Sequence, residues 1–443
     1  MSEFFGAPKK SLPAPRSARF SGVALLGPAL VAGVAYLDPG NVAANMSAGA
    51  LYGYLLVWVI VAANTMAWLV QYLSAKLGVV TGRSLPEILG ERIGHRWARR
   101  LYWLQAELVA IATDLAEIIG GAVALHLLFG LPLLLGGVIT GAVSIGILAV
   151  HNRRGARPFE HTIVALMIII TAGFVAGLFI APPDPAGIAT GMLPRFTDSG
   201  SVLLAASILG ATIMPHAIYA HSALTRDRFH APTAMERQHP DATTPATTAA
   251  PSPVTAPAQR IRTLLRATRW DVTIAMVVAG SVNLAMLLLA AANLAGVDGT
   301  DTLDGAYHAL ADHLGPIIAV MFAVALLASG LASTAVGAYA GADIMHGLLH
   351  IRVPLLTRRL ITLIPALAIL AAGIDPTLAL ILSQVALSFG IPFALVPLLV
   401  VTAQRRTLGA FTNRAITTAV GALCAVLLIA LNIALIVLTA LGV

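Results

Sequence analysis

Long apolar segments, separated by short gaps that hold charged residues or Pro and Gly, run through most of the chain. A helix needs about 20 apolar residues to cross a bilayer, so nearly every segment is long enough for one crossing. The pattern therefore predicts eleven membrane-spanning helices, of which the ninth is the shortest. The predicted spans are residues 21–51, 53–75, 101–129, 131–150, 159–181, 201–224, 271–296, 316–345, 360–374, 376–402 and 415–442.

The amino-acid composition indicates the same class of protein. Of the 443 residues, 58% are hydrophobic and 11% are charged, which excludes an ordinary soluble protein. The lone cysteine, Cys424, lies in an apolar run, so a disulfide framework and a cysteine-based zinc or iron-sulfur site are excluded. The basic residues occupy short gaps between apolar runs, so the net charge of +7 does not indicate nucleic-acid binding. We expect a multi-pass protein of the cell membrane, embedded in the lipid bilayer, with no nucleic-acid partner.

Basic residues in the gaps predict the orientation of the chain. With the N-terminus inside the cell, 26 of the 27 Lys and Arg residues fall on the cytoplasmic side, and only Arg195 falls outside. A missed or additional helix would scramble this division, so it supports eleven spans. The N-terminus is predicted to be cytoplasmic and the C-terminus outside. Residues 1–20 are predicted to be a retained cytoplasmic tail and not a signal peptide.

The longest gap, residues 225–268, has a centre rich in Pro, Thr and Ala, DATTPATTAAPSPVTAPAQ. Such a composition cannot bury a core, so we expect a disordered cytoplasmic linker. No other gap is large enough for a soluble catalytic domain. We therefore expect that the protein is not an enzyme.

Two predicted spans carry residues that interrupt a helix near its middle. The first contains DPGN at residues 38–41, and the sixth contains Gly210 followed by MPH at residues 214–216. An aspartate at mid-helix costs about 2.5–3.5 kcal/mol on insertion scales, and proline removes a backbone donor. Broken backbone is tolerated only where it lines a cavity or is buried in protein. One proline kink would indicate only a bend. Breaks five helices apart predict an inverted-repeat transporter with its site at the midplane between two five-helix halves.

The side chains at the two breaks predict what binds there. Asp38 supplies a negative charge, Asn41 a neutral oxygen and Met214 a thioether sulfur. Unwound backbone would add carbonyl oxygens such as those of Ala35 and Ala211. One carboxylate among neutral donors suits a cation, and the sulfur favours Mn²⁺, Fe²⁺, Co²⁺ or Cd²⁺ over Mg²⁺ or Ca²⁺. The alternative is that Met214 only fills an apolar gap.

Three carboxylates lie within the third predicted span. Glu107, Asp114 and Glu117 are spaced by seven and three residues, which puts them roughly on one face of a helix. Intramembrane carboxylates that face the bundle interior mark proton relays or ion paths, and Arg358 and Arg359 at the start of the ninth span are plausible partners. The alternative is a static ion-pair network that fixes helix packing.

Two histidines follow the break in the sixth span. His216 and His221 are five residues apart, which is too far around a helix for the paired histidines of a zinc protease. Histidine titrates near physiological pH, so either residue could take part in proton movement or gating. His216 is the stronger candidate because it adjoins the predicted metal site. A packed, neutral histidine remains an equal alternative for His221.

Taken together, these segments resemble the Nramp family of metal-ion transporters. The resemblance is carried by DPGN at 38–41 and MPH at 214–216. It extends to the acidic third helix (AELVAIATDLAEIIG), the small-residue eighth helix (LLASGLASTAVGAYAG) and the Gln-bearing tenth helix (SQVALSFGIPFALVPLL), and so covers residues 20–440.

The resemblance implies an all-α integral membrane protein with eleven helices and a LeuT-like 5+5 inverted repeat. Helices 1 and 6 would be discontinuous, and the eleventh helix would lie outside the repeat. It divides the chain into a first five-helix repeat at 21–181, a second at 182–402 and the eleventh helix at 403–443. It further implies a monomer without a cofactor that imports Mn²⁺ or Fe²⁺, commonly with proton movement.

The resemblance also assigns roles to individual residues. Asp38, Asn41 and Met214 would be metal-ligand side chains, and the carbonyls of Ala211 or Ala35 would contribute in different states. Gln384 would approach the metal in closed intermediates. The proton pathway would involve Asp38 and the third-helix carboxylates with their arginine and histidine neighbours. Protonation of Asp38 would weaken its hold on a cation, so metal arrival and proton release could be coupled there.

Three positions depart from the family pattern. Ala217 stands where the family usually has Asn, while Leu331 and Ala342 stand where polar Gln is common. These departures concern gating polarity or rate, and none removes a predicted ligand.

Three other functions remain open. A same-fold transporter of Mg²⁺ or amino acids is the nearest, although Mg²⁺ has no use for Met214 and a carboxylated substrate would avoid Asp38. A gated cation channel would more often show a symmetric pore-loop sequence. A metal-sensing receptor would need a folded output domain.

Overall fold

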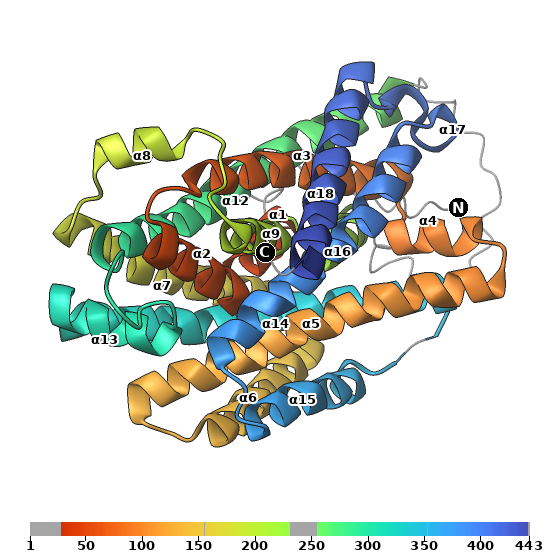
Figure 1. Ribbon diagram of the computed structural model, residues 1–443. Coiled ribbons are helices and arrows are strands. Elements are labelled where there is room, and N and C mark those ends of the chain that lie inside the picture. Colours follow the sequence, from red (N-terminus) through yellow and green to blue (C-terminus); the bar gives the residue numbers. More distant parts are fainter. Residues whose placement is uncertain (1–27, 155, 231–254, 352, 442–443) are drawn as a thin grey trace, which may run out of the picture.

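The computed structural model describes residues 28–154, 156–230, 255–351 and 353–441, and every regular element in these ranges is a helix (Figure 1). In the part of the chain that the structure describes, helices occupy all eleven predicted spans. The spans of the first half are α1 (Pro28–Val34), η2 (Ala35–Leu37) and α2 (Pro39–Tyr52), α3 (Val57–Thr81), α5 (Arg96–Phe129), α6 (Leu133–Arg154) and α7 (Ala156–Ile180). Those of the second half are α9 (Ser199–Thr212) and α10 (Pro215–His230), α12 (Thr255–Asn293), α14 (Pro316–Leu349), α15 (Leu355–Ala371) and α16 (Pro376–Thr402), followed by α18 (Ala415–Leu441).

Length and composition support a membrane-embedded bundle. In the described residues, seven helical segments are long and apolar enough to cross a membrane, and the paired helices α9 and α10 count as one of them. The last helix, α18, carries many exposed apolar side chains, including Ile416, Leu423 and Val426. Side chains of this kind are stable against lipid and costly in water. The chain is therefore an integral membrane protein.

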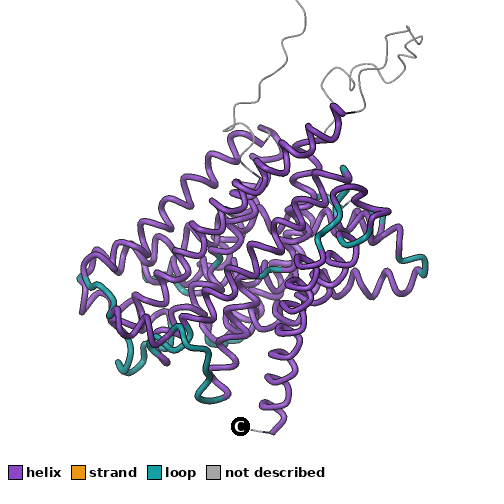
Figure 2. Tube along the Cα trace, turned by 90° about the horizontal axis from the view of Figure 1, so that it is seen from above, coloured by secondary structure: helices purple, strands orange, loops and turns teal. Residues whose placement is uncertain are grey.

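Short helices join the spans. They are α4 (Leu85–Arg92), α8 (Pro185–Gly191), α13 (Leu303–Leu314), α17 (Arg405–Leu408) and η3 (Gly409–Phe411). The long helix α5 packs against α14, α16, α6 and α15, and α2 packs against α12 and α9. Figure 2 shows the same bundle from above, with most loops at its periphery. Helix α2 packs against α12 and α16, and α10 packs against α3, α14 and α16, so continuous helices border both broken ones.

The linker expected at residues 225–268 is shorter than predicted. Helix α10 continues through His230 and α12 begins at Thr255, so residues 225–230 and 255–268 are helical. Apolar residues such as Ile261, Leu264 and Leu265 recur between the arginines of this segment, and that spacing supports a helix that continues the span. The prediction of disorder was wrong at both ends. Its centre, 231–254, and the tail at 1–20 lie outside the described residues.

Ion pairs centred on Arg226 close one end of the bundle. Its Nη1 lies 2.6 Å from Glu87 Oε1 of α4 and 3.0 Å from Asp343 Oδ1 of α14. Its Nε lies 2.8 Å from Asp227 Oδ1, and the Tyr339 hydroxyl donates to the other oxygen of Asp227. Helices α4, α10 and α14 are thereby tied together at this end.

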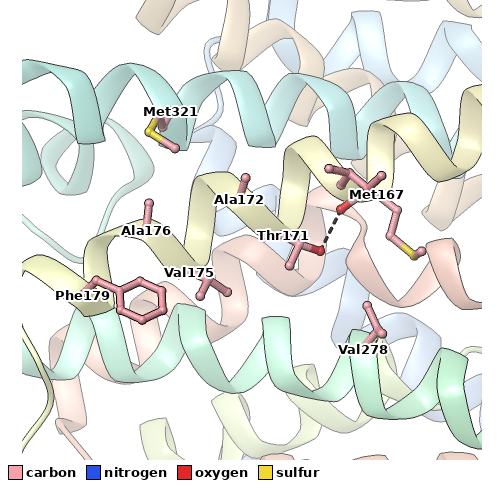
Figure 3. Close-up of a pocket in the computed structure, with 9 residues that line it drawn as sticks. Met167, Thr171, Ala172, Val175, Ala176, Phe179, Val278 and Met321 are labelled. Atoms are coloured by element: carbon pink, nitrogen blue, oxygen red, sulfur yellow. Dashed lines mark hydrogen bonds between the residues drawn. The ribbon is translucent and has the colours of Figure 1, made fainter.

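A surface groove of ≈ 610 Å³ lies between α7, α12 and α14 (Figure 3). Its lining is apolar apart from Thr171, whose hydroxyl donates to the Met167 carbonyl at 2.7 Å. None of its residues belongs to either helix break. The groove offers no polar group for a cation, and its chemistry fits contact with lipid.

Candidate metal centre

The first helix is broken at the predicted place. After Val34 one 3₁₀ turn, Ala35–Leu37, leads to Asp38, which has extended backbone angles, φ −70° and ψ 163°. Asp38 then caps α2, because its carboxylate accepts from the backbone N–H groups of Gly40 at 3.3 Å and Asn41 at 3.0 Å. Pro39 suits the first helical position, where no N–H is needed. The carboxylate therefore sits at the positive end of a helix dipole in the interior of the bundle.

The sixth span is also broken. Helix α9 ends at Thr212 and α10 begins at Pro215, so Ile213 and Met214 form the connection. Gly210 was expected within this interruption, but it lies inside α9. Proline starts α10 for the same reason that it starts α2, namely that it lacks the N–H a first helical residue would leave unbonded.

Side chains from the first break and from α16, and a backbone carbonyl of α9, form one hydrogen-bonded group around Asp38. The Asn41 Nδ2 group donates to Asp38 Oδ1 at 2.8 Å and to the Ala211 carbonyl at 2.9 Å. Gln384 Nε2 donates to Asp38 Oδ2 at 3.1 Å. All four residues are fully buried. The Ala211 carbonyl is one of the last four of α9, which have no partner within their own helix. The structure thus brings four of the six predicted metal-site residues into one hydrogen-bonded group.

Two oxygens of this group remain without a partner. Asn41 Oδ1 and Gln384 Oε1 are buried and accept no hydrogen bond from any described residue. A buried acceptor left unsatisfied costs about 1–3 kcal/mol. Amide and carboxylate oxygens are ligands that divalent cations accept in proteins. The two amides present their N–H groups to Asp38, so their oxygens would be available to a cation at the carboxylate only if the amides turned over.

Met214 and Ala35 lie in the two breaks. Met214 is fully buried in the connection between α9 and α10, and its own carbonyl accepts from Ile218 N at 3.3 Å. Ala35 is fully buried in the 3₁₀ turn of the first break. In the described residues, no group of three or more His, Cys, Asp or Glu side chains could hold a metal. A cation at this centre would therefore depend on amide, carbonyl and thioether donors around a single carboxylate.

Helix α16 packs closely on both broken helices through Gln384. A Cβ added at Gly40 would lie 1.7 Å from Gln384 Nε2, and one added at Gly210 would lie 1.9 Å from the Gln384 carbonyl oxygen. Only glycine permits this approach. Sequence reasoning did not identify these contacts. The available signal was a glycine in each interrupted span together with a glutamine in an apolar helix.

Other polar residues hold the unwound backbone of the first break. Asn283 Nδ2 of α12 donates to the Tyr36 carbonyl at 3.1 Å, and the Ser329 hydroxyl of α14 donates to the Leu37 carbonyl. These bonds satisfy carbonyls that the broken helix leaves free, as membrane burial requires. Sequence reasoning missed both residues, although a buried Asn or Ser in an apolar span was a visible signal.

Arg359 forms the centre of a buried ion-pair network. Its Nη1 lies 2.7 Å from Asp114 Oδ1 and 3.0 Å from Glu117 Oε2. Its Nε and Nη2 donate to the hydroxyls of Ser144 at 3.1 Å and Thr334 at 3.2 Å. Arg359 is only 1% exposed, so α15 is tied to α5, α6 and α14 in the interior of the bundle.

Arg358 pairs with Glu107 and Asp114 of the same carboxylate row. Its Nε donates to Glu107 Oε1 at 3.1 Å, and its Nη1 lies 3.7 Å from Asp114 Oδ2. The structure therefore brings together the three predicted carboxylates and the two predicted arginines. Both a proton path and a fixed packing network are compatible with these contacts.

The two histidines contact different helices. His216 Nδ1 lies 3.1 Å from Thr113 Oγ1 of α5, beside the carboxylate row. His221 Nδ1 lies 2.7 Å from Gln71 Oε1 of α3. Both side chains are buried. His216 therefore joins the broken helix α10 to the ionisable row, whereas His221 joins it to α3.

Comparison with known proteins identifies the family. The family model described as natural resistance-associated macrophage protein-like (Nramp) matches residues 29–438. The divalent metal cation transporter MntH of Mycobacterium tuberculosis is 58% identical over 418 residues, which cover 94% of this chain and 92% of the relative.

Solved structures agree with this assignment. The manganese transporter of Eremococcus coleocola, in complex with an aromatic bis-isothiourea substituted compound, is 29% identical, with a TM-score of 0.79 over 95% of this chain and 87% of that one. Mhp1, a nucleobase-cation-symport-1 family transporter, shares the fold alone, at 15% identity and a TM-score of 0.55 over 94% of this chain and 92% of that one. The predicted LeuT-like helical architecture is confirmed, and the chain belongs to the Nramp family.

Proposed function

We propose that this protein is a secondary transporter that imports divalent transition-metal ions, Mn²⁺ or Fe²⁺, by alternating access at the centre formed by the two breaks. Membership of the Nramp family supports this function, and so do the names of the relatives, which describe divalent metal cation and manganese transporters. The observation that carries the proposal is the group of Asp38, Asn41 and Gln384, in which buried amide oxygens stand unpartnered beside a carboxylate.

The hydrogen bonds suggest how the centre would respond to its substrate. Asn41 and Gln384 present N–H groups to the Asp38 carboxylate. A cation bound to that carboxylate would repel these N–H groups and attract the amide oxygens, so each amide would turn over or withdraw. Turning Asn41 also breaks its bond to the Ala211 carbonyl and frees that oxygen for the metal. Metal arrival would thereby uncouple α2 from α9 and allow the broken helices to rearrange.

The ligand set proposed for the metal comprises Asp38, Asn41, Met214 and the Ala211 carbonyl, with Ala35 and Gln384 contributing in other states. Met214 is the selective member, because Mg²⁺ gains nothing from a sulfur ligand whereas Mn²⁺ and Cd²⁺ tolerate or favour one. Its place in the second break, fully buried, supports this role.

Competition uptake tests this proposal. Proteoliposomes with the unaltered protein should take up Mn²⁺ and Cd²⁺ in preference to Mg²⁺, and Met214→Ala should lose most of that preference while Mg²⁺ competes more strongly. Loss of a residue that only orients a metal ligand typically costs about 10- to 100-fold in metal affinity, so loss of a ligand should cost at least as much. A matched control is Met321→Ala, which removes a methionine that lines the apolar groove and lies outside both breaks. Unchanged selectivity in Met214→Ala would contradict the ligand assignment.

We also propose that protons move with the metal. Asp38 would release a proton when a cation arrives, and His216 with the row of Glu107, Asp114 and Glu117 would carry it, aided by Arg358 and Arg359. His221, bonded to Gln71, would take part in gating. The contact of His216 with Thr113, beside the carboxylate row, supports a path that connects the two.

The remaining proposals concern topology and assembly. We propose a cytoplasmic N-terminus and an external C-terminus, supported by the distribution of Lys and Arg between the gaps. The proposed repeats remain 21–181 and 182–402, and the chain is proposed to act as a monomer.

A further inference from the structure

A basic face precedes the apolar part of α12. Arg262, Arg266 and Arg269 follow one another at intervals of four and three residues, so they lie on one side of the helix. All three side chains are exposed. Within the described part of the chain, Arg262 and Arg266 have no ion-pair partner. Three positive charges are therefore available on one helix face next to the predicted membrane surface.

Aromatic side chains indicate how deep in the membrane the arginine face of α12 lies. The Arg269 guanidinium lies over the Trp68 ring of α3, 5.9 Å from its centroid, and Trp68 stacks on Tyr72 at 6.1 Å. Trp68 Nε1 also donates to Thr273 Oγ1 at 3.0 Å and so fixes α3 to α12. Trp270 is 61% exposed. Trp and Tyr collect at the headgroup level of a bilayer, so these residues place the arginines at the same level.

A groove continues from the arginines along the same two helices. It measures ≈ 220 Å³ and lies between α3 and α12. Gly280 follows Arg269 by eleven residues, about three helical turns or about 17 Å, and therefore lies on the same side of α12. The residues that line the groove are Ile60, Val61, Asn64, Thr65, Val277, Gly280, Ser281 and Leu284. The groove thus runs from the headgroup level into the apolar part of the bundle surface.

We propose that the face formed by α3 and α12 binds one anionic phospholipid. The phosphate of its headgroup lies against Arg262, Arg266 and Arg269, and one acyl chain lies along the groove beside Val277 and Leu284. A cluster of arginines next to a membrane-spanning helix complements the negative headgroups of the cytoplasmic leaflet. A second copy of this chain is disfavoured on the same face, because its own arginines would meet these. The proposal does not depend on the identity of the transported ion.

A lipid bound at this site would stabilise the helix that supports the first break. The Ala29 N–H of α1 donates to Asp271 of α12 at 2.9 Å, directly after the arginines, and Asn283 of α12 holds the Tyr36 carbonyl. Helix α12 is therefore the support on which the inner half of the first broken helix rests. A phospholipid that fixes α12 stabilises that support.

Native mass spectrometry of the full-length protein with added phosphatidylglycerol or phosphatidylcholine tests the headgroup contact. Each arginine at a membrane surface contributes about a fivefold change in binding, so Arg262→Gln with Arg266→Gln should weaken phosphatidylglycerol binding by about 25-fold. Phosphatidylcholine, whose choline cation offsets its phosphate charge, should bind the unaltered protein more weakly and should lose less affinity in this variant. The charge-matched control is Arg260→Gln with Arg405→Gln, because Arg260 lies on the opposite face of α12 and Arg405 on α17. Equal phosphatidylglycerol binding by both double variants would overturn the proposal.

A second variant tests the acyl chain independently of charge. Val277→Trp would fill the groove, and phosphatidylglycerol binding should fall although all three arginines remain. Val426→Trp is the control, because Val426 is exposed on α18 at a similar level, 60% against 58% for Val277. Thermal unfolding in detergent without added lipid verifies that each variant is folded. Binding that is insensitive to Val277→Trp would exclude the groove as the acyl-chain site.

Discussion

Gln384 contacts both broken helices through different atoms. Its side chain reaches Asp38 and covers Gly40, while its backbone carbonyl lies against Gly210. A side chain contact can yield by rotating, but a backbone contact yields only when one helix moves. A larger residue should therefore be tolerated less well at Gly210 than at Gly40, even though Gly210 lies inside a regular helix and not in the break.

Gly210→Ala should destabilise the protein and reduce metal uptake. The added methyl group would meet the Gln384 carbonyl, and overpacking of this kind typically costs about 1–3 kcal/mol. The thermal unfolding temperature in detergent measures the loss. Gly146→Ala is the matched control, because a Cβ at that position of α6 meets nothing within 4 Å. Alanine there should be neutral or stabilising by up to about 1 kcal/mol. Equal behaviour of the two variants would contradict the close contact of α9 with α16.

At this scale the sequence predicted the site residues whose side chains are costly to place in lipid. It missed the residues whose role depends on a contact with a helix far away in the sequence. Asp38 and its neighbours stood out because a carboxylate, a proline and a glycine together disfavour a membrane helix. Asn283 and Ser329 gave weaker signals, because a single small polar residue is common in such helices. The demand for glycine at 210 depends on where α16 packs, and no local pattern contains that information.

At the scale of elements, α15 is short and is held in the bundle by its fifth residue, Arg359. Arg359 bonds to two carboxylates and two hydroxyls on three other helices. A guanidinium can serve four partners at once because its donors are planar and fixed. The position of α15 therefore depends on one side chain more than on its apolar surface, much of which is exposed.

Arg359→Gln should be strongly destabilising. It would leave Asp114 and Glu117 buried without their cation, and breaking a buried pair typically costs about 3–5 kcal/mol. Arg359→Lys should restore little of this, since an ammonium group cannot reach four partners. Arg83→Gln serves as the control, because Arg83 pairs with Glu91 at an exposed site, where the expected cost is about 0–1 kcal/mol. The thermal unfolding temperatures of the three variants, measured in one detergent, rank their stabilities. A mild effect of Arg359→Gln would show that Asp114 and Glu117 are not buried as ions.

The sequence predicted the spanning elements well, because about twenty apolar residues in a row allow few other structures. It did not predict α4, α8, α13 and α17, which are short and mixed in composition. The helical start of α12 was also missed, because four arginines in a short segment suggested a loop. Three of them, Arg262, Arg266 and Arg269, are spaced by four and three residues, and that helical spacing was a signal the prediction overlooked.

At the scale of the whole molecule, the proposed proton movement requires the metal centre and the carboxylate row to act together. Two connections between them are visible. His216 in α10 contacts Thr113 beside the row, and a Cβ added at Gly120 of α5 would lie 2.1 Å from Pro39, next to Asp38. The helix that carries the carboxylates thus packs directly on the first break.

Uptake and internal acidification, measured together in proteoliposomes, should rise in parallel when Mn²⁺ is supplied under an inward proton gradient. Asp38→Asn should abolish both, because it removes the only carboxylate proposed as a ligand. Glu117→Gln should reduce acidification more than uptake, because it alters the proposed proton path and leaves every proposed ligand in place. Mn²⁺ entry by the unaltered protein without any proton flux would reject coupling.

The ties made by Arg226 constrain how the bundle can open at that end. One guanidinium holds partners on α4 and α14 while its own helix, α10, carries the second break. Separating α10 from α4 alone would leave Arg226 paired with Asp343 of α14, and separating it from α14 alone would leave it paired with Glu87 of α4. Any opening that frees α10 from both neighbours has to break both ion pairs and return one shared cation to water. The two separations are therefore energetically coupled through a single side chain.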